Sequence, residues 1–414
     1  MSLTQRPHLS LSKDKIKILL LEGIDPSASQ LLNDAGYTNI HKVSHAVQGE
    51  ELKQLIKDVH FIGVRSQSKL TADVLSAADK LVGVGCFCIG TNQVDLNVAS
   101  EKGIPVFNAP FSNTRSVAEL VIAESIMLLR GIPDKSRLAH EGGWLKSAKD
   151  SYEIRGKTLG IVGYGAIGAQ LSVLAEAVGL EVLYYDLENK LPLGNARQIQ
   201  RLEDLLAQSD IVSLHVPEDR STEWMIDEQQ IAACKPGSIM INASRGRVIR
   251  IEPLAEALKS GHLLGAALDV FPEEPGSNNE RFISPLQGLA NVILTPHIGG
   301  STIEAQRNIG VEVAQKFIMY SDTGATTGSV NLPDVRLPQH EGKHRLIHVH
   351  RNVAGVLSGV NGILSRHSVN VAAQYLQTKN GIGYMVMDVD SSYPSEVIAE
   401  LDAVEGTIRT RVLY

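Results

Sequence analysis

Short apolar runs alternate with stretches of helical spacing over the first hundred residues. The runs are typical of buried strands, and the stretches between them carry apolar residues three and four positions apart, as amphipathic helices do. Strands are expected at 16–21, 61–64, 81–85 and 104–107, and helices at 27–35, 50–58 and 71–78. This alternation predicts a parallel sheet with crossover helices.

A second alternating series fills the middle of the chain. It follows a long apolar stretch at 116–129, which predicts a largely buried helix that ends near Gly131 and Pro133. Strands are expected at 158–163, 181–186, 211–216, 238–243, 265–270 and 292–295. Six strands with helices between them are what a dinucleotide-binding doubly wound sheet requires. A further helix is expected at 302–320.

The C-terminal part of the chain has a different pattern. Strands are expected at 345–350, 369–378, 383–390 and 407–413, with helices at 355–365 and 394–403. This is the βαββαβ order of a ferredoxin-like fold. Residues 321–343 lack periodicity and predict a linker or a crossing segment. The fold class is therefore α/β, with two doubly wound parallel-sheet (Rossmann/flavodoxin-like) domains and a C-terminal ferredoxin-like domain.

Composition narrows the classes of protein that fit. The chain has 414 residues, 43% of them apolar and 21% charged, which suits several folded domains. Its net charge of −7 argues against a non-specific nucleic-acid binder. Cys86, Cys88 and Cys234 are too few for a disulfide framework and lack the spacing of metal ligands, so we expect reduced thiols and no metal site.

The apolar runs also bear on the compartment. Residues 1–13 are polar, and the run at 16–21 is far too short to cross a bilayer. A cytoplasmic protein without a membrane partner is expected.

A glycine-rich turn follows the strand expected at 158–163. Gly163, Gly165 and Gly168 form G-x-G-x-x-G where a strand passes into a helix. The three glycines allow a tight turn, close approach of a pyrophosphate, and close packing of the helix on the strand. Asp186 ends the next strand, where a carboxylate binds the ribose 2′-hydroxyl and repels a 2′-phosphate. The alternative is an ordinary tight turn, but the complete set favours NAD.

Three charged residues follow later strands of the same series. Arg245, Glu274 and His297 come after the strands expected at 238–243, 265–270 and 292–295. Ligands of open parallel sheets bind at the carboxyl ends of the strands. His297 suits proton transfer near neutral pH, Glu274 would favour its imidazolium form, and Arg245 offers a planar fork of donors to a carboxylate. Each could alone be an ordinary surface residue, but their joint placement favours a hydride-transfer site.

At this point the sequence resembles the D-2-hydroxyacid dehydrogenase family. The resemblance covers nearly the whole chain, and its motifs are specific as an ordered set. The matching stretches are 85–95, 107–119, 159–168, 241–246, 267–271, 274–275 and 294–302.

The resemblance implies roles for individual residues. Arg245, Glu274 and His297 match the family's catalytic arginine, glutamate and acid–base histidine. Arg65, Ser66 and Asn113 match positions that approach the substrate. The implied NAD contacts, besides the glycine turn and Asp186, are Ala166, Ile167, Ala243, Ser244, Arg245, Asp269, His297, Ile298, Gly299 and Gly300.

The resemblance also implies three domains. Residues 1–112 and 302–334 would form a discontinuous substrate-binding domain, 113–301 the NAD-binding domain, and 344–414 an ACT regulatory domain. His350, Asn352 and Asn370 match positions that bind L-serine between paired subunits, although the asparagines could simply be loop or capping residues.

The sequence departs from the family pattern in two places. After Arg245 and Gly246 the family has a short apolar pair and an aspartate, whereas this chain has Arg247-Val-Ile-Arg250, so a base replaces a helix-capping acid beside the predicted catalytic loop. Val353 and Ala354 replace an arginine and a proline in the ACT part, which bears on the strength of serine regulation.

The implied reaction is oxidation of 3-phospho-D-glycerate to 3-phosphooxypyruvate with NAD⁺, the first step of L-serine biosynthesis. Reduction of 2-oxoglutarate is a second implied activity, L-serine the implied effector, and a homotetramer the implied assembly. Lys146, Arg65 and Arg137 are unranked candidates for holding the substrate phosphate. The alternatives are another D-2-hydroxyacid dehydrogenase, or a non-catalytic NADH-sensing scaffold that resembles the corepressors of this fold.

Overall fold

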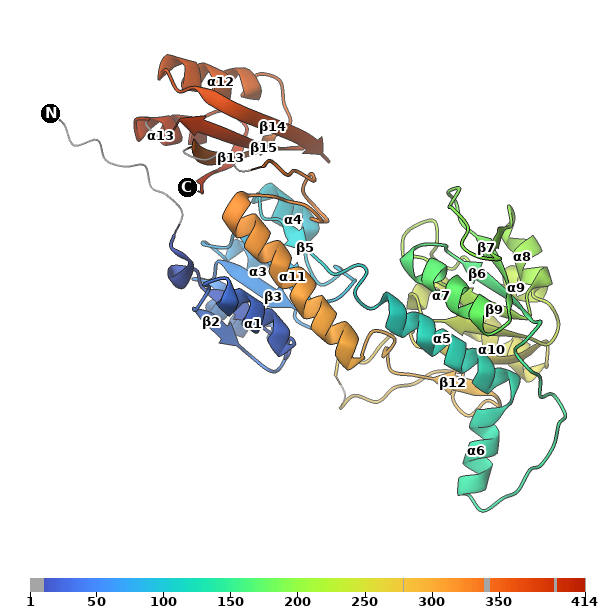
Figure 1. Ribbon diagram of the computed structural model, residues 1–414. Helices are drawn as coiled ribbons and strands as arrows, with labels where there is room; N and C mark the ends of the chain where they lie inside the picture. The colour runs from blue at the N-terminus through green and yellow to red at the C-terminus, as the bar shows by residue number, and fades with distance from the viewer. Residues whose placement is uncertain (1–10, 278, 339–342, 391–392, 414) are drawn as a thin grey trace. The chain divides into compact units, whose positions relative to one another are not determined.

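A computed structural model describes residues 11–277, 279–338, 343–390 and 393–413 (Figure 1). The chain divides into two compact units, Met1–Pro110 with Gln306–Tyr414, and Phe111–Ala305. The first unit contains two sheets and the second contains one.

The first sheet is parallel, with the strand order β2-β1-β3-β4-β5. Its strands are β1 (Ile18–Leu20), β2 (Ile40–Lys42), β3 (Phe61–Val64), β4 (Gly83–Cys86) and β5 (Val106–Phe107). The helices of this part are α1 (Pro26–Asp34), α2 (Gly49–Ile56), α3 (Ala72–Ser76), α4 (Leu96–Glu101) and α11 (Ile303–Thr323), after a 3₁₀ turn, η1 (Lys13–Lys15). The order 2-1-3-4-5 is that of a flavodoxin-like doubly wound fold. The predicted strands and helices are present, whereas β2 and α4 were not predicted.

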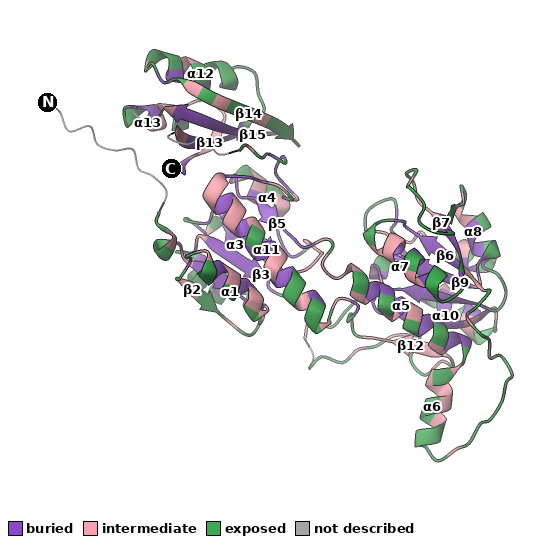
Figure 2. Ribbon diagram, viewed as in Figure 1, coloured by how far each residue is buried: buried purple, intermediate pink, exposed green. Residues whose placement is uncertain are grey.

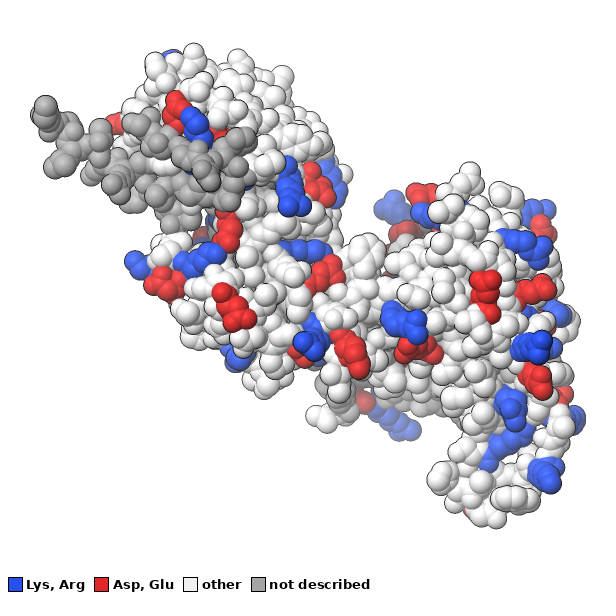
Figure 3. All heavy atoms as spheres, in the orientation of Figure 1, with Lys and Arg blue, Asp and Glu red and all other residues white. Residues whose placement is uncertain are grey.

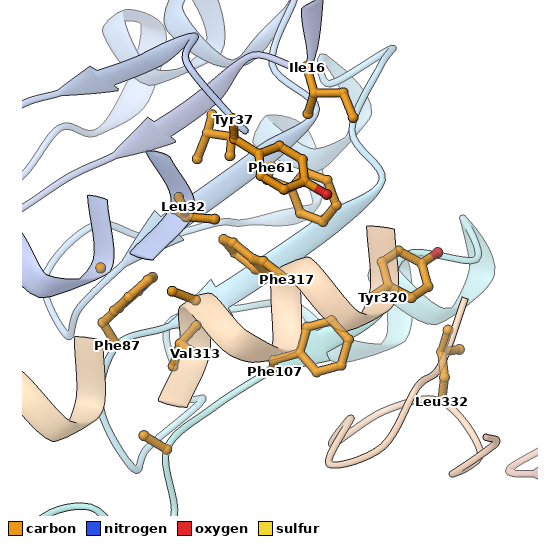
Figure 4. Close-up of a cluster of buried hydrophobic side chains, with 14 of the residues drawn as sticks. Ile16, Leu32, Tyr37, Phe61, Phe87, Phe107, Val313, Phe317, Tyr320 and Leu332 are labelled. Atoms are coloured by element: carbon orange, nitrogen blue, oxygen red, sulfur yellow. The ribbon is translucent and has the colours of Figure 1, made fainter. Parts of the chain in front are cut away.

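Helix α11 supplies aromatic side chains to the core of this sheet (Figure 4). The Phe317 ring lies 4.9 Å from that of Phe61, and the Tyr320 ring lies 5.8 Å from that of Phe107, between centroids. Leu332 and Val335 are fully buried in the same core. Of the two alternatives for residues 321–343, these contacts favour a crossing segment over a linker along this stretch, because two apolar side chains are enough to hold an aperiodic segment against the core.

The second unit holds a seven-stranded parallel sheet of order β12-β11-β10-β9-β6-β7-β8. Its strands are β6 (Thr158–Val162), β7 (Glu181–Tyr185), β8 (Arg197–Gln198), β9 (Ile211–Leu214), β10 (Ser238–Asn242), β11 (Leu263–Leu268) and β12 (Val292–Leu294). The helices are α5 (Thr114–Leu129), α6 (Ile132–His140), α7 (Ala166–Ala177), α8 (Leu202–Gln208), α9 (Glu228–Ala233) and α10 (Ile251–Lys259), with a 3₁₀ turn, η2 (Gly246–Val248). The order reverses between β6 and β9, which is the ligand-binding position of a Rossmann sheet.

Two elements of the second unit were not predicted. Helix α6 begins shortly after α5 ends at Leu129, and Pro133 lies in its first turn, where proline is tolerated. None of its residues is buried, as Figure 2 shows. Strand β8 has only two residues at the sheet edge. Both lack the periodic burial on which sequence prediction depends.

The C-terminal sheet is antiparallel, with the order β14-β15-β13-β16. It comprises β13 (Lys343–Arg351), α12 (Val356–Arg366), β14 (Val371–Lys379), β15 (Ile382–Asp390), α13 (Glu396–Asp402) and β16 (Thr407–Val412), the βαββαβ order that was predicted. Side chains from one face pack with α12 and α13, and side chains from the other belong to the core that contains Phe317. The fold class is confirmed.

Charge is spread over the face of the molecule drawn in Figure 3. Acidic and basic side chains are interspersed on this face. Among the described residues, no helix is long and apolar enough to cross a membrane. Nor does that part of the chain hold a cluster of three or more metal-ligating side chains.

Candidate active site

The predicted catalytic residues follow three adjacent strands of the second unit. Arg245 follows β10, Glu274 follows β11 and His297 follows β12. Because parallel strands end at the same edge of a sheet, the three residues come together there. The charge of Arg245 acts on the pKa values of both His297 and Glu274.

His297 is held by a hydrogen bond to Glu274. Its Nδ1 lies 2.9 Å from Glu274 Oε2, and the side chains remain 52% and 35% exposed. The hydrogen bond that His297 donates to Glu274 raises the pKa of His297 above its ordinary value. Since Glu274 engages Nδ1, the Nε2 atom is left to exchange a proton with a ligand.

The surroundings of Glu274 favour its ionised form. Partial burial acts to raise the pKa of Glu274. The hydrogen bond and charge of His297, together with a hydrogen bond from the Phe271 amide, lower this pKa by a larger amount. The pKa of Glu274 therefore lies below its ordinary value. An ionised Glu274 favours the imidazolium form of His297.

Asp269 fixes the loop that carries His297. Its carboxylate accepts hydrogen bonds from Thr295 Oγ1 and from the amides of Ile298 and Gly299, at 2.6–2.7 Å. His297 has a positive φ of 54°, which a residue other than glycine rarely adopts. Such local strain persists only where surrounding contacts hold it, and it is common at functional sites.

Arg245 begins a turn that is braced on two sides. The fully buried Asn242 donates from Nδ2 to the Arg245 carbonyl at 2.9 Å and accepts from Ser244. A Cβ at Gly246 would lie 2.0 Å from the Phe271 backbone, so only glycine allows this approach. The Arg245 turn therefore packs directly on the chain that leads to Glu274.

The glycine-rich turn leaves the N-terminus of α7 open. Gly163 has a φ of 94°, and a Cβ on Gly168 would lie 2.3 Å from the Gly163 carbonyl oxygen. Gly165 has no neighbouring atom within 4 Å of the position where a Cβ would stand, and as N-cap of α7 it makes no side-chain cap. The free amides of Ala166 and Ile167 at an uncapped N-terminus fit a pyrophosphate.

Asp186 is at the end of β7, beside this turn. Its carboxylate accepts hydrogen bonds from the amides of Tyr164, at 2.8 Å, and Glu188, at 3.0 Å. This places an acidic side chain next to the glycine turn, as the prediction of a ribose-binding residue requires. The residues present fit NAD.

The remaining predicted contacts lie in different places. Ala243 and Ser244 follow β10, and Asn113 packs against Gly300, where a Cβ would meet its Nδ2 at 2.5 Å. Arg65 and Ser66 follow β3 in the first unit. The structure does not test their predicted contact with the substrate.

Comparison with known proteins assigns the family. The model for "D-isomer specific 2-hydroxyacid dehydrogenase, NAD binding domain" matches residues 122–299, and that for "AHAS small subunit-like ACT domain" matches 346–409. The chain is 58% identical to D-3-phosphoglycerate dehydrogenase of Haemophilus influenzae over 406 residues, which cover 98% of this chain and 99% of that protein. Its identity to the enzyme of Escherichia coli K12 is 57%, over 98% and 99% of the two chains.

The chain belongs to the D-3-phosphoglycerate dehydrogenase family. The predicted resemblance is thereby confirmed, and the cofactor of this D-2-hydroxyacid dehydrogenase is NAD. Among solved structures, D-lactate dehydrogenase from Aquifex aeolicus, complexed with NAD and lactic acid, covers 77% of this chain and all of that chain, with a TM-score of 0.67 and 25% identity.

The ACT domain of this family member separates the residues predicted to bind serine. His350 is buried near the end of β13, and Asn352 follows that strand. The Asn370 carbonyl accepts from the Asp390 amide at the opposite end of β13, where Asp390 pairs with Lys343. Seven residues along a strand span about 23 Å, so one chain does not bring Asn370 to the other two.

Two residues that support the site were missed by sequence reasoning. Asn242 braces Arg245, and Glu22 accepts from the amides of Arg65, Gln67 and Ser68. An amide or carboxyl side chain at the carboxyl end of a buried strand, within it or just beyond it, is a signal that could have found both. Their role depends on contacts with loops, which periodicity does not reveal.

Proposed function

We propose that the chain oxidises 3-phospho-D-glycerate to 3-phosphooxypyruvate with NAD⁺, the first step of L-serine biosynthesis. The observation that carries this proposal is the hydrogen bond between His297 and Glu274 beside Arg245 at the carboxyl edge of the sheet. The near-complete coverage of relatives named for this reaction supports the choice of substrate.

His297 acts as the acid–base group at its Nε2 atom. During oxidation the neutral imidazole accepts the proton of the substrate hydroxyl, and during reduction the imidazolium returns it. Glu274 holds the ring by Nδ1 and stabilises the imidazolium, which forms in the oxidative direction.

Arg245 binds the carboxylate and the adjacent oxygen of the substrate. A guanidinium presents paired donors in a plane, which match a 2-hydroxy acid or 2-oxo acid. Arg65, Ser66 and Asn113 are proposed to complete substrate binding, with Lys146 and Arg137 as further candidates for the phosphate. Since the net charge is −7, a local cationic site must offset the repulsion of an anionic substrate.

The second unit binds NAD through the glycine turn. The amides at the start of α7 hold the pyrophosphate, and Asp186, whose carboxylate oxygens can each accept a further hydrogen bond, holds the ribose hydroxyls. When bound, NAD⁺ supplies the hydride acceptor. Residues 113–301 are proposed as the NAD-binding domain, and 1–112 with 302–334 as the substrate-binding domain.

The proposed reaction is tested by steady-state assay with NADH and 3-phosphooxypyruvate. We expect turnover that falls by between about 10²- and 10⁴-fold in His297→Ala. Equal rates for the two proteins would refute the proposal. A higher kcat/KM for glyoxylate or pyruvate would favour another D-2-hydroxyacid dehydrogenase, and NADH binding without turnover of any 2-oxo acid would favour a scaffold. Including 2-oxoglutarate tests the proposed second activity.

We also propose that L-serine inhibits the enzyme at residues 344–414. His350, Asn352 and Asn370 are the proposed ligands, and their separation within one chain requires a second copy to complete each site. This supports a paired arrangement within a cytoplasmic homotetramer. Unchanged activity in millimolar L-serine, with the oligomer intact by light scattering, would remove this part of the proposal.

The hydrogen bonds around His350 support its role as an acceptor. Burial lowers the pKa of His348 to about 4 and also lowers that of His350, so both rings are neutral. Thr407 donates to the Leu401 carbonyl and accepts from His348 Nε2, so His348 Nδ1 accepts from His350 Nδ1 at 3.1 Å. His350 Nε2 is then the free acceptor, suited to an ammonium or hydroxyl group.

A further inference from the structure

Trp224 has an unusual backbone conformation close to the Arg245 turn. Its φ is 57°, a left-handed value that is a genuine outlier for a bulky side chain. The residue lies in the loop between β9 and α9, and its amide donates to the Arg247 carbonyl at 2.7 Å. Strain of this kind persists only where several contacts enforce it.

The loop around Trp224 is bonded to the chain that follows Arg245. The Ile226 amide donates to the Val248 carbonyl at 3.1 Å, and the Arg250 amide donates to the Ile226 carbonyl at 3.0 Å. Together with the bond from Trp224, these hydrogen bonds hold residues 247–250 as a short parallel bridge. The Arg245 turn is therefore fixed from its far side as well as by Asn242.

Arg250 acts on the Trp224 side chain instead of capping its own helix. It is the N-cap of α10 but makes no side-chain cap, and its guanidinium lies 4.9 Å from the centre of the Trp224 ring. A cation at a helix N-terminus is unfavourable, whereas a guanidinium over an indole is attracted to it. Arg247 lies 3.7 Å from Glu223, the neighbour of Trp224. Arg247 and Arg250, the two basic residues that depart from the family pattern, thus contact the neighbouring residues Glu223 and Trp224.

We propose that Trp224 is a positioning residue for Arg245, held in its left-handed conformation by Arg250. The proposal rests on the proposed function, because it assumes that Arg245 binds the substrate carboxylate. The Trp224 loop fixes the backbone position of residues 246–250. Because the Gly246 backbone packs closely against that of Phe271, a shift in these residues would also move Arg245. Recognition of the 2-hydroxy acid depends on this contact, whereas NAD binding at α7 does not.

The test compares Trp224→Ala and Arg250→Ala with Trp224→Phe and Arg250→Lys, which retain a ring and a cation. Arg220→Ala is the matched control, since Arg220 is an exposed arginine in the same loop. We expect kcat/KM for 3-phosphooxypyruvate to fall about 10- to 100-fold in the alanine variants, and about threefold or less in the conservative variants and the control. The Kd for NADH, measured by calorimetry, should stay within about twofold.

The Tm of each variant shows whether it has lost folding stability and not only the positioning of Arg245. Arg250→Ala is the safer of the two alanine variants in this respect, because the Arg250 side chain is exposed. Trp224→Ala and Arg250→Ala are also made in an Arg245→Lys background. There we expect each substitution to lower kcat/KM by less than about a further twofold. If Arg250→Ala retains full activity, or if the losses persist undiminished in the Arg245→Lys background, the inference is overturned. If Arg245→Ala itself retains activity, the proposed function fails instead.

Discussion

Glu124 is a single carboxyl group that the fold holds in an unusual charge state. It lies on α5, which packs on β10 and β11, and its side chain is 2% exposed. Neither of its oxygens has a hydrogen-bond partner among the described residues. Burial, and to a smaller extent the charge of Asp269, raises the pKa of Glu124 to about 8. The residue is therefore protonated at neutral pH.

Glu124→Gln should stabilise the second unit increasingly as pH rises. Below pH 4.5 the carboxyl is protonated in both the folded and the unfolded state, so its ionisation costs nothing. Between pH 4.5 and 8 only the unfolded chain ionises, and the free energy of unfolding falls by up to about 1.4 kcal/mol per pH unit. Because Gln does not ionise, it removes this loss. The free energy of unfolding of the variant should therefore increase relative to that of the native protein across that pH range.

Guanidinium unfolding at about pH 5, 6, 7 and 8 measures the difference. Both tryptophans, Trp144 and Trp224, lie in the second unit, so their fluorescence follows its unfolding. Glu119→Gln is the control, because Glu119 is exposed on the same helix and pairs with Arg115. If the free energy of unfolding of Glu124→Gln differs from that of the native protein by the same amount at all four pH values, the burial argument is contradicted.

Glu274→Gln should move the pH dependence of the reductive reaction. Reduction requires His297 to carry a proton, so activity is present below the raised pKa of His297 and is lost as pH rises through it. The hydrogen bond to the Glu274 carboxylate, and then its charge, raise this pKa; a neutral Gln supplies neither a charged acceptor nor the charge, so the loss should begin at lower pH. The dependence of kcat/KM on pH, with 3-phosphooxypyruvate and NADH, reports the shift. Glu273→Gln, an exposed neighbour, should leave the profile in place.

Residues that follow buried strands were the ones that sequence reasoning found. Arg245, Glu274 and His297 were predicted because each stands just after an apolar run, and the sheet places them at one edge. Trp224 was missed, since its role depends on a positive φ and on a contact with Arg250. Neither leaves a periodic trace in the sequence.

Among the elements, the apolar strands were predicted, including β5 and β12 at sheet edges, whereas the short edge strands β2 and β8, which have no buried residue, were missed. Strand β3 occurs at the predicted bounds, Phe61–Val64, because a strand buried on both faces is a continuous apolar run. Strand β2, Ile40–Lys42, is at the edge of its sheet and has no buried residue. An edge strand of three residues is defined by its pairing with β1, which only the folded sheet supplies.

The strand–turn–helix element at α7 predicts different outcomes for two of its glycines. Gly165→Ala meets no atom of the protein, so Tm should stay within about 2 °C, whereas the Kd for NADH should rise at least about tenfold because the methyl group would occupy the pyrophosphate position. Gly168→Ala brings a Cβ within 2.3 Å of the Gly163 carbonyl, so both Tm and affinity should fall. Calorimetry and thermal unfolding measure the two quantities. Equal effects of the two variants on Tm would contradict the packing argument.

At the scale of the whole molecule, a buried charge pair joins the C-terminal sheet to helix α11 within the first unit. Arg345 and Asp388 are fully buried and lie 2.7 Å apart, and Arg345 also donates to the carbonyls of Thr323, Leu337 and Pro338. Thr323 is the last residue of α11. One guanidinium thus ties the sheet to the helix that fills the first core, so a change in the sheet has a direct route to that core.

The ends of β13 give the serine proposal a test that depends on two copies of the chain. His350 and Asn370 lie at opposite ends of the strand, so each site of a symmetric pair takes His350 from one copy and Asn370 from the other. His350→Ala alone and Asn370→Ala alone should each abolish inhibition, because every site of either homo-oligomer lacks one ligand.

Co-expression of the two variants with different affinity tags should restore part of the inhibition. In a hybrid pair, one site receives both substitutions and the other receives none, so the purified hybrid should respond to L-serine with about half the sites of the native enzyme. Activity without serine should be the same in all forms, since His350 and Asn370 belong to the C-terminal sheet and its loops and not to the proposed substrate, NAD or acid–base residues. A hybrid that remains insensitive would contradict a site shared between copies, whereas inhibition in either single-variant oligomer would contradict the assignment of that residue.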